Sequence, residues 1–156
     1  MAESRLPVSV NSRPQEIDLG PLSDFIGFAL RNAQEASFRA FARRVETAGL
    51  KPGQFAALMV IHHNPGLTQM DLAQAIARDK STVTPLIQDL QRLDLIERKP
   101  SEQDRRRNTL RLTPAGERAL AGLMTHAEAH DRRLDAIVGE HKALFLSLLK
   151  RVNAEL

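Results

Sequence analysis

Three observations predict a mainly α-helical fold with one small β-hairpin. Apolar residues recur every three or four positions over most of residues 21–94 and 114–152, which is the period of amphipathic helices. Only residues 95–99 and 108–113 alternate apolar with polar side chains, as half-buried strands do. Helix-capping and helix-ending residues stand between the periodic segments. We therefore expect six helices plus a two-stranded β-wing, in the order of a winged helix-turn-helix.

The first predicted helix covers residues 21–48, and Gly49 follows it as a C-cap. A helix of this length extends roughly 40 Å at 1.5 Å per residue, so we expect it to pack on something besides its own chain. Residues 1–20 contain Pro7 and Pro14 and show no periodicity. They are expected to form a flexible N-terminal arm.

Three shorter helices follow. The second covers residues 52–63, the third runs from about 68 to 77, and the fourth from about 79 to 94. Thr68 and Asp79 are the expected N-caps of the last two, because their side-chain oxygens can accept hydrogen bonds from free backbone N–H groups. Lys51 precedes the second helix in place of a capping hydroxyl, which predicts a weaker start there. Pro85 removes one hydrogen bond inside the fourth helix and is expected to bend it.

Two long helices are expected after the hairpin. Thr113 can cap the fifth, with Pro114 at its first position, where a missing N–H costs nothing. Gly139 marks its end, and apolar residues from Leu144 to Val152 define the sixth helix.

The composition excludes several kinds of chemistry. The chain has no cysteine, which excludes disulfides, thiolate metal sites and thiol nucleophiles. No run of about 18 apolar residues and no signal peptide is present, so we expect a cytoplasmic protein without membrane contact. The net charge of the 156 residues is only +3. Residues 98–111 nevertheless hold six cations against two carboxylates, so the basic character is concentrated at the hairpin.

The fourth helix has the chemistry to read DNA. In a winged helix-turn-helix, the last of three successive helices lies in the major groove, and the hairpin reaches the backbone or the minor groove. The first turns of this helix present short or flexible polar side chains suited to phosphates and base edges. These candidate DNA-binding residues are Lys80, Ser81, Thr82, Thr84 and Gln88.

Residues 67–120 resemble the winged-helix core of the MarR family of bacterial transcriptional regulators. The wing of that family carries Asp-x-Arg at a fixed distance before Leu-Thr-x-x-Gly. Here Asp104 and Arg106 precede Leu112, Thr113 and Gly116 with that spacing. The flanking long helices extend the resemblance over most of the chain.

The resemblance implies how DNA is bound. Arg106 enters the minor groove and Asp104 orients it, while Ser81, Thr82 and Thr84 take the major-groove positions. Arg105 and Arg107 are then phosphate contacts. The family pattern also implies a homodimer on a palindromic operator of double-stranded DNA, in which residues 21–50 and 114–156 form the dimerisation helices and residues 51–113 the DNA-binding lobe.

A repressor that a small molecule releases is the function we expect. The implied effector lies between the dimerisation helices and the DNA-binding lobe, and an aromatic acid or its acyl thioester fits the cations available there. No cofactor is expected. The candidate ligand-binding residues are Arg39, Arg43, Phe55, His62 and His63.

Three functions are alternatives to DNA binding: an enzyme, a protein-binding winged helix and a zinc-responsive regulator. An enzyme has no support, because no phosphate-binding glycine loop, nucleophile elbow or metalloprotease motif is present. The winged helix could instead bind an acidic protein partner through its arginines. His126 and His130, four residues apart on one helix, could present two imidazoles to zinc, which would make the protein a zinc-responsive regulator.

Overall fold

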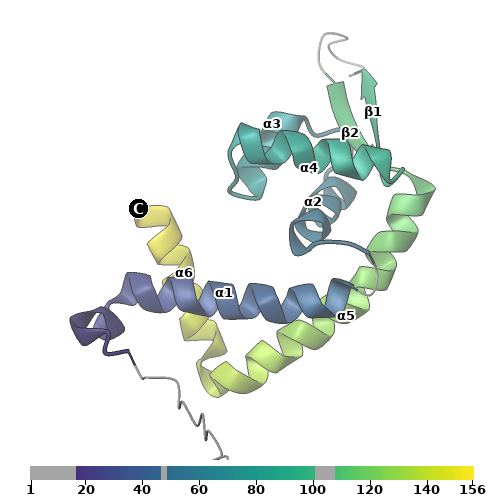
Figure 1. Ribbon diagram of the computed structural model, residues 1–156. Coiled ribbons are helices and arrows are strands. Elements are labelled where there is room, and N and C mark those ends of the chain that lie inside the picture. Colours follow the sequence, from purple (N-terminus) through teal and green to yellow (C-terminus); the bar gives the residue numbers. More distant parts are fainter. Residues whose placement is uncertain (1–16, 47–48, 101–107) are drawn as a thin grey trace, which may run out of the picture. The chain divides into compact units, whose positions relative to one another are not determined.

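The structure is a computed structural model that describes residues 17–46, 49–100 and 108–156 (Figure 1). The predicted tip of the wing, with Asp104, Arg105, Arg106 and Arg107, and most of the predicted N-terminal arm lie outside these residues. The chain divides into two compact units, residues 1–35 and residues 36–156.

The first unit contains a short 3-10 helix, η1 (Gly20–Asp24), and the beginning of α1 (Ile26–Val45). The two are separate because Phe25 has an extended backbone, with ψ of 125°. The N–H of Leu22 bonds the carbonyl of Leu19 at 3.2 Å, which is the tighter i→i−3 pattern. The expectation of one helix from residue 21 was therefore wrong at its start, and α1 begins at Ile26.

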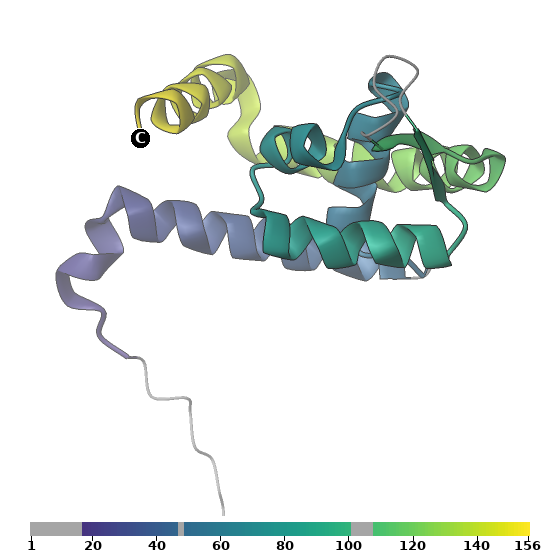
Figure 2. The same cartoon turned by 90° about the horizontal axis from the view of Figure 1, so that it is seen from above.

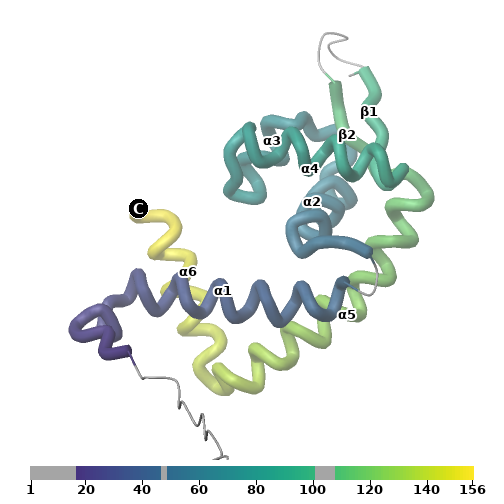
Figure 3. Tube along the Cα trace, in the orientation of Figure 1, coloured from purple at the N-terminus to yellow at the C-terminus, as the bar shows by residue number. Residues whose placement is uncertain are grey.

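The second unit has the predicted winged helix-turn-helix order, so the expected fold class is confirmed (Figure 3). Strands β1 and β2 are antiparallel, with Ile96 opposite Leu112 and Pro100 opposite Asn108. A 3-10 turn, η3 (Gly139–His141), links the last two helices. The elements are α2 (Pro52–His63), α3 (Gln69–Ala75), α4 (Lys80–Arg92), β1 (Ile96–Pro100), β2 (Asn108–Leu112), α5 (Pro114–Val138) and α6 (Lys142–Glu155).

The helix starts follow from their capping residues. Thr68 Oγ1 accepts from the N–H of Asp71 at 3.3 Å, and Asp71 Oδ2 accepts from the N–H of Thr68 at 2.8 Å. Helix α2 has a cap that the sequence analysis missed. The buried Gln54 side chain accepts from the backbone N–H of Lys51 at 2.8 Å, which offsets the missing hydroxyl at that position.

Helix α4 contains Pro85 in its interior, and its ribbon runs without a break (Figures 1 and 2). A proline inside a helix removes the hydrogen bond to the carbonyl four residues earlier, here that of Ser81. The helix persists because its apolar side is held by burial, with Val83, Ile87 and Leu90 fully enclosed.

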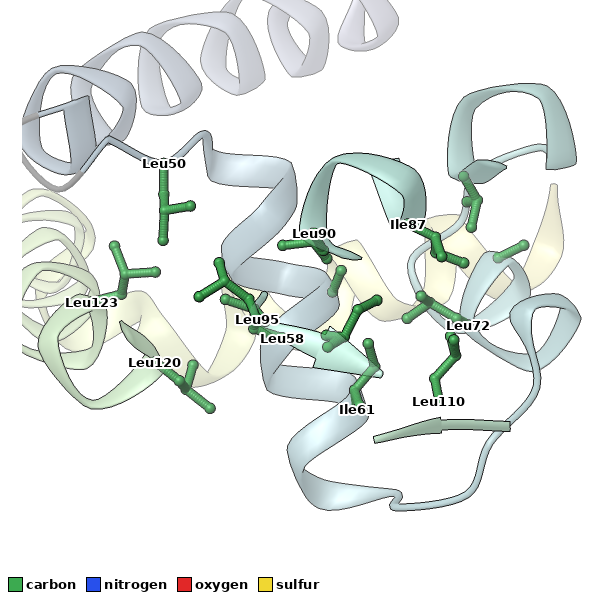
Figure 4. Close-up of a cluster of buried hydrophobic side chains, with 14 of the residues drawn as sticks. Leu50, Leu58, Ile61, Leu72, Ile87, Leu90, Leu95, Leu110, Leu120 and Leu123 are labelled. Atoms are coloured by element: carbon green, nitrogen blue, oxygen red, sulfur yellow. The ribbon is translucent and has the colours of Figure 1, made fainter. Parts of the chain in front are cut away.

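The hydrophobic core lies around α2. Leu58 and Ile61 of α2 are fully buried, and side chains from α3, α4, both strands and α5 surround them (Figure 4). Burying one such side chain stabilises the fold by about 1.5–3 kcal/mol. The first turns of α5 belong to this same core. The members of the core that Figure 4 labels are Leu50, Leu58, Ile61, Leu72, Ile87, Leu90, Leu95, Leu110, Leu120 and Leu123.

The hairpin and α5 meet at a tight joint. Thr113 Oγ1 accepts from the N–H of Gly116 at 3.0 Å and donates to the carbonyl of Asp94 at 2.6 Å. The Thr113 N–H donates to the carbonyl of Leu95 at 3.1 Å. A Cβ added to Gly116 would overlap that same Leu95 carbonyl oxygen. The Thr-x-x-Gly spacing is therefore explained by close packing of α5 on the chain before β1.

We expect Gly116→Ala to lower the free energy of unfolding by about 1–3 kcal/mol, because backbone must move to admit the methyl group. Gly122→Ala is the matched control, since it lies in the same helix and its added Cβ meets nothing within 4 Å. The control should raise stability by about 0.5–1 kcal/mol. Urea unfolding midpoints measure both changes. Equal stability of the two variants would contradict the tight joint.

Candidate nucleic-acid interface

Helix α4 separates an apolar side from a polar side. Val83, Ile87 and Leu90 are buried in the core, whereas the predicted DNA-binding residues lie on the other side. Thr84 is half-buried, and the rest of that set is exposed, namely Lys80, Ser81, Thr82 and Gln88. Of these residues, Ser81, Thr84 and Gln88 are spaced three and four positions apart and share one face of the helix, and Lys80 and Thr82 lie to either side of it in the first turn.

The start of α4 carries a capping carboxylate. Asp79 Oδ1 accepts from the hydroxyl of Ser81 at 2.6 Å and from the N–H of Thr82 at 2.7 Å. The Ser81 hydroxyl, followed by the Thr82 N–H, holds the pKa of Asp79 below its ordinary value. This negative charge offsets part of the attraction that a helix N-terminus has for phosphate. Lys80, the next residue, is an exposed cation.

The hydroxyl of Thr84 is already engaged inside the protein. Thr84 Oγ1 donates to the carbonyl of Lys80 at 2.8 Å and accepts from Gln69 Nε2 at 2.7 Å. A hydroxyl has one proton and two lone pairs. Thr84 can therefore offer a base edge one lone pair or its methyl group, while its hydrogen-bond donor is used within the helix.

The base of the wing is held in place by the loop before α3. The N–H of Leu110 donates to the carbonyl of Leu67 at 2.9 Å, and the N–H of Gly66 donates to the carbonyl of Leu110 at 3.1 Å. Thr68 and Thr109 form a β-bridge beside them. This pairing was not predicted, because three residues between a turn and a helix cap are too few to show alternation.

The described part of the wing is basic. Arg98, Lys99 and Arg111 lie on its two strands, and Lys99 Nζ is 2.6 Å from Glu97 Oε1. Arg98 Nη2 donates to Gln69 Oε1 on α3 at 3.0 Å. The strands lead directly to residues 101–107, which carry the predicted arginine cluster.

A pocket of about 550 Å³ lies at the end of α1 and the start of α2. Arg39 and Arg43, four residues apart on α1 and both predicted to bind a ligand, line it. Lys51 is a third cation that was missed, since its position suggested only a helix start. Glu46 is the one carboxylate in the lining. The pocket thus has an excess of positive charge and a volume typical of small-molecule sites.

The other predicted ligand residues do not line this pocket. Phe55 packs edge-on against Phe41, with ring centroids 5.4 Å apart, beside the core. His62 Nδ1 lies 2.8 Å from Glu117 Oε2 and so links α2 to α5. His63 Nδ1 lies 3.0 Å from the carbonyl oxygen of Met59 in its own helix.

The described residues do not provide His126 and His130 with the further ligand that a zinc site would need. Within residues 17–46, 49–100 and 108–156, no three His, Asp or Glu side chains are grouped closely enough to hold a metal ion. His130 Nε2 lies 3.0 Å from Ser37 Oγ, and its ring stacks at 5.5 Å from Phe41. Burial, followed by the charge of Arg44, lowers the pKa of His130. These contacts account for His130 as a packed side chain linking α5 to α1.

A helix-turn-helix with an exposed polar face on its last helix, followed by a basic two-stranded wing, defines a winged-helix DNA-binding protein. Residues 48–107 match the model of the MarR family. A protein of Thauera aromatica, named as a transcriptional regulatory protein for the hcr operon, is 38% identical over 144 residues, which cover 91% of this chain and 87% of that protein. The chain belongs to the MarR family, as the sequence resemblance predicted, and is a transcriptional regulator that binds DNA.

Solved structures agree with this assignment. The transcriptional repressor CouR bound to a 23-mer DNA duplex is 31% identical, with a TM-score of 0.81 over 88% of this chain and 99% of that one. CouR bound to p-coumaroyl-CoA is 29% identical, with a TM-score of 0.81 over 90% of this chain and 100% of that one.

In the part of the chain that the structure describes, no helix is long and apolar enough to cross a membrane.

Replacing Asp79 should destabilise the protein in a pH-dependent way. A carboxylate whose pKa is lower in the folded chain stabilises that state above the unfolded-state pKa, and this contribution disappears as pH falls through the folded-state value. Asp79→Ala should therefore be less stable than wild type at neutral pH, and the difference should shrink below the ordinary carboxyl pKa.

Asp79→Asn is the matched control, because it keeps a capping oxygen without a titrating group. Its stability difference from Asp79→Ala should not change over the same acidic range. Thermal melts from neutral pH to about pH 2 measure these differences. A wild-type advantage over Asp79→Ala that did not change with pH would contradict the assigned role of the carboxylate.

Proposed function

We propose that the protein is a homodimeric repressor that binds a palindromic operator and is released by a small anionic effector. The observation that carries the proposal is the polar face of α4, held by its buried apolar side and set beside a basic wing. Such a helix presents its first turns to base edges, while the wing reaches the DNA backbone or the minor groove. DNA-bound CouR supports the same use of the fold.

The dimer is supported by an apolar surface on the C-terminal helices. Leu144, Phe145 and Leu148 of α6 are 60%, 44% and 47% exposed, and Ile137 of α5 is 73% exposed. Exposed large apolar side chains that recur along one helix are the pattern expected of an association site. We assign residues 21–50 and 114–156 to dimer contacts and residues 51–113 to DNA binding. A two-fold axis would then present one α4 to each half of the palindrome.

The effector is proposed to be an aromatic acid or its acyl thioester, bound at the pocket of Arg39, Arg43 and Lys51. Three cations against one carboxylate favour an anionic ligand, and the phosphates of a coenzyme A thioester supply such charge. The CouR complex with p-coumaroyl-CoA supports this class. Release of DNA requires that the effector bind the geometry without DNA more tightly than the DNA-bound one.

We expect Arg106→Ala to weaken operator binding by about 1–3 kcal/mol, because a minor-groove contact is lost while the dimer stays intact. Fluorescence anisotropy with the protein's own upstream DNA measures affinity, and sedimentation measures the dimer. Arg132→Ala replaces an exposed arginine of α5, outside the DNA-binding lobe, and is the matched control; sedimentation should show its dimer intact and its operator affinity should equal that of wild type. If wild-type protein protected no palindromic site in upstream DNA even at low salt, the repressor proposal would fail.

The effector site is tested with p-coumaroyl-CoA as the probe. The thioester should raise the melting temperature of the wild-type dimer, because a ligand that binds only the folded state stabilises it. Arg39→Ala combined with Arg43→Ala should weaken thioester binding by at least roughly tenfold, since each lost charge-assisted hydrogen bond contributes about 1.5–3 kcal/mol. Calorimetry gives the affinities.

Arg118→Ala is the control for charge alone, because Arg118 is exposed on α5 and does not line the pocket. Its thioester affinity should equal that of wild type. Free coenzyme A and free p-coumarate separate the contributions of the phosphates and the aromatic group. Equal affinity of the control and the double variant would place the effector elsewhere.

A further inference from the structure

The side-chain amide of Gln69 is used at both ends. Gln69 is the first residue of α3, and its Oε1 accepts from Arg98 Nη2 on β1 at 3.0 Å. Its Nε2 donates to Thr84 Oγ1 on α4 at 2.7 Å. Thr84 Oγ1 in turn donates to the carbonyl of Lys80 at 2.8 Å. These three hydrogen bonds connect the wing, α3 and α4. We term the residues Arg98, Gln69 and Thr84 the Gln69 relay.

The chemistry of the relay permits only one orientation of the amide. A reversed amide would place its NH₂ group against the guanidinium of Arg98, which has donors only. The observed orientation instead places the amide oxygen against the Arg98 donor and the amide NH₂ against the Thr84 hydroxyl oxygen. Each member therefore limits the rotamer of the next, and Gln69, half-buried between its partners, is fixed from both sides.

The relay adds a polar side-chain link between elements that also meet in the hydrophobic core. Its residues are 15 and 29 positions apart in the sequence. The backbone bonds between Leu67 and Leu110 attach β2 to the start of α3, but they involve no part of α4. Gln69 connects the start of α3 to α4 through its hydrogen bond to Thr84, which in turn bonds the carbonyl of Lys80.

We propose that Gln69 is a positioning residue that holds the wing and the recognition helix in one register, and so sets operator specificity more than general DNA affinity. The proposal rests on the proposed use of α4 and the wing in DNA binding. Contacts with base edges need a fixed geometry, whereas phosphate contacts by long cationic side chains tolerate displacement. Loss of the relay should therefore weaken operator binding selectively.

The first test compares operator and non-specific DNA at one salt concentration by anisotropy. Gln69→Ala should weaken operator binding roughly tenfold, the effect of about one hydrogen-bonded link. Its affinity for a non-specific duplex should change less than about twofold, because phosphate contacts supply that affinity. Gln74→Ala, an exposed glutamine of the same helix, is the matched control and should leave both affinities unchanged. Thermal melts confirm that each variant is folded.

The second test asks whether Gln69 carries the coupling. Thr84→Val and Arg98→Met remove the two outer partners while keeping similar side-chain volume. Their effects on operator affinity should be non-additive in the wild-type background and additive in the Gln69→Ala background. Additivity in both backgrounds would overturn the relay, as would an equal loss of affinity for operator and non-specific DNA in Gln69→Ala.

Lys80→Ala separates failure of the relay from failure of the proposed function. If Lys80→Ala and Arg106→Ala weaken DNA binding but Gln69→Ala leaves specificity intact, only the relay is overturned. If none of these variants affects DNA binding, the proposal that α4 and the wing bind DNA is overturned, and the proposed role of the relay is overturned with it.

Discussion

Burial of apolar side chains around α2 is the constraint on which the rest of the second unit depends. Leu58 and Ile61 contact a shell drawn from α3, α4, the hairpin and the start of α5. Because this core closes one side of α4, its polar side must face outward. The capping residues decide where each helix begins, but the core decides which face is available for DNA. The continuity of α4 through Pro85 follows from the same burial.

Polar links then set how the wing stands relative to the helices. The wing is joined to α3 through the backbone at Leu67 and Leu110, and to α5 through the Thr113 and Gly116 joint. Neither link uses long side chains, so both restrict the strands closely. Besides apolar packing in the core, side-chain hydrogen bonds lead from the wing to α4 through Gln69. Backbone hydrogen bonds and short side chains thus hold the wing on α3 and α5, whereas longer side chains form the polar link between the wing and α4.

The proposed effector pocket shares a residue with this core. Leu50 lines the pocket and also belongs to the buried cluster, where only 9% of it is exposed. A ligand at Arg39, Arg43 and Lys51 would therefore contact the packing that supports α2. Close-packed cores do not deform continuously, so a displacement there is passed to neighbouring elements. This connection offers a physical route from effector binding to the position of α4.

The sequence by itself determined the order and type of the elements, the capping roles of Thr68, Asp79 and Thr113, and the polar face of α4. These follow from periodicity and local hydrogen bonding, which act over a few residues. It also placed Arg39 and Arg43 together, because a spacing of four residues shares one helix face. Only the tertiary structure revealed Lys51 in the pocket and Gln69 between Arg98 and Thr84. Such contacts join residues by packing across the fold, and the pattern along the chain carries no signal for them.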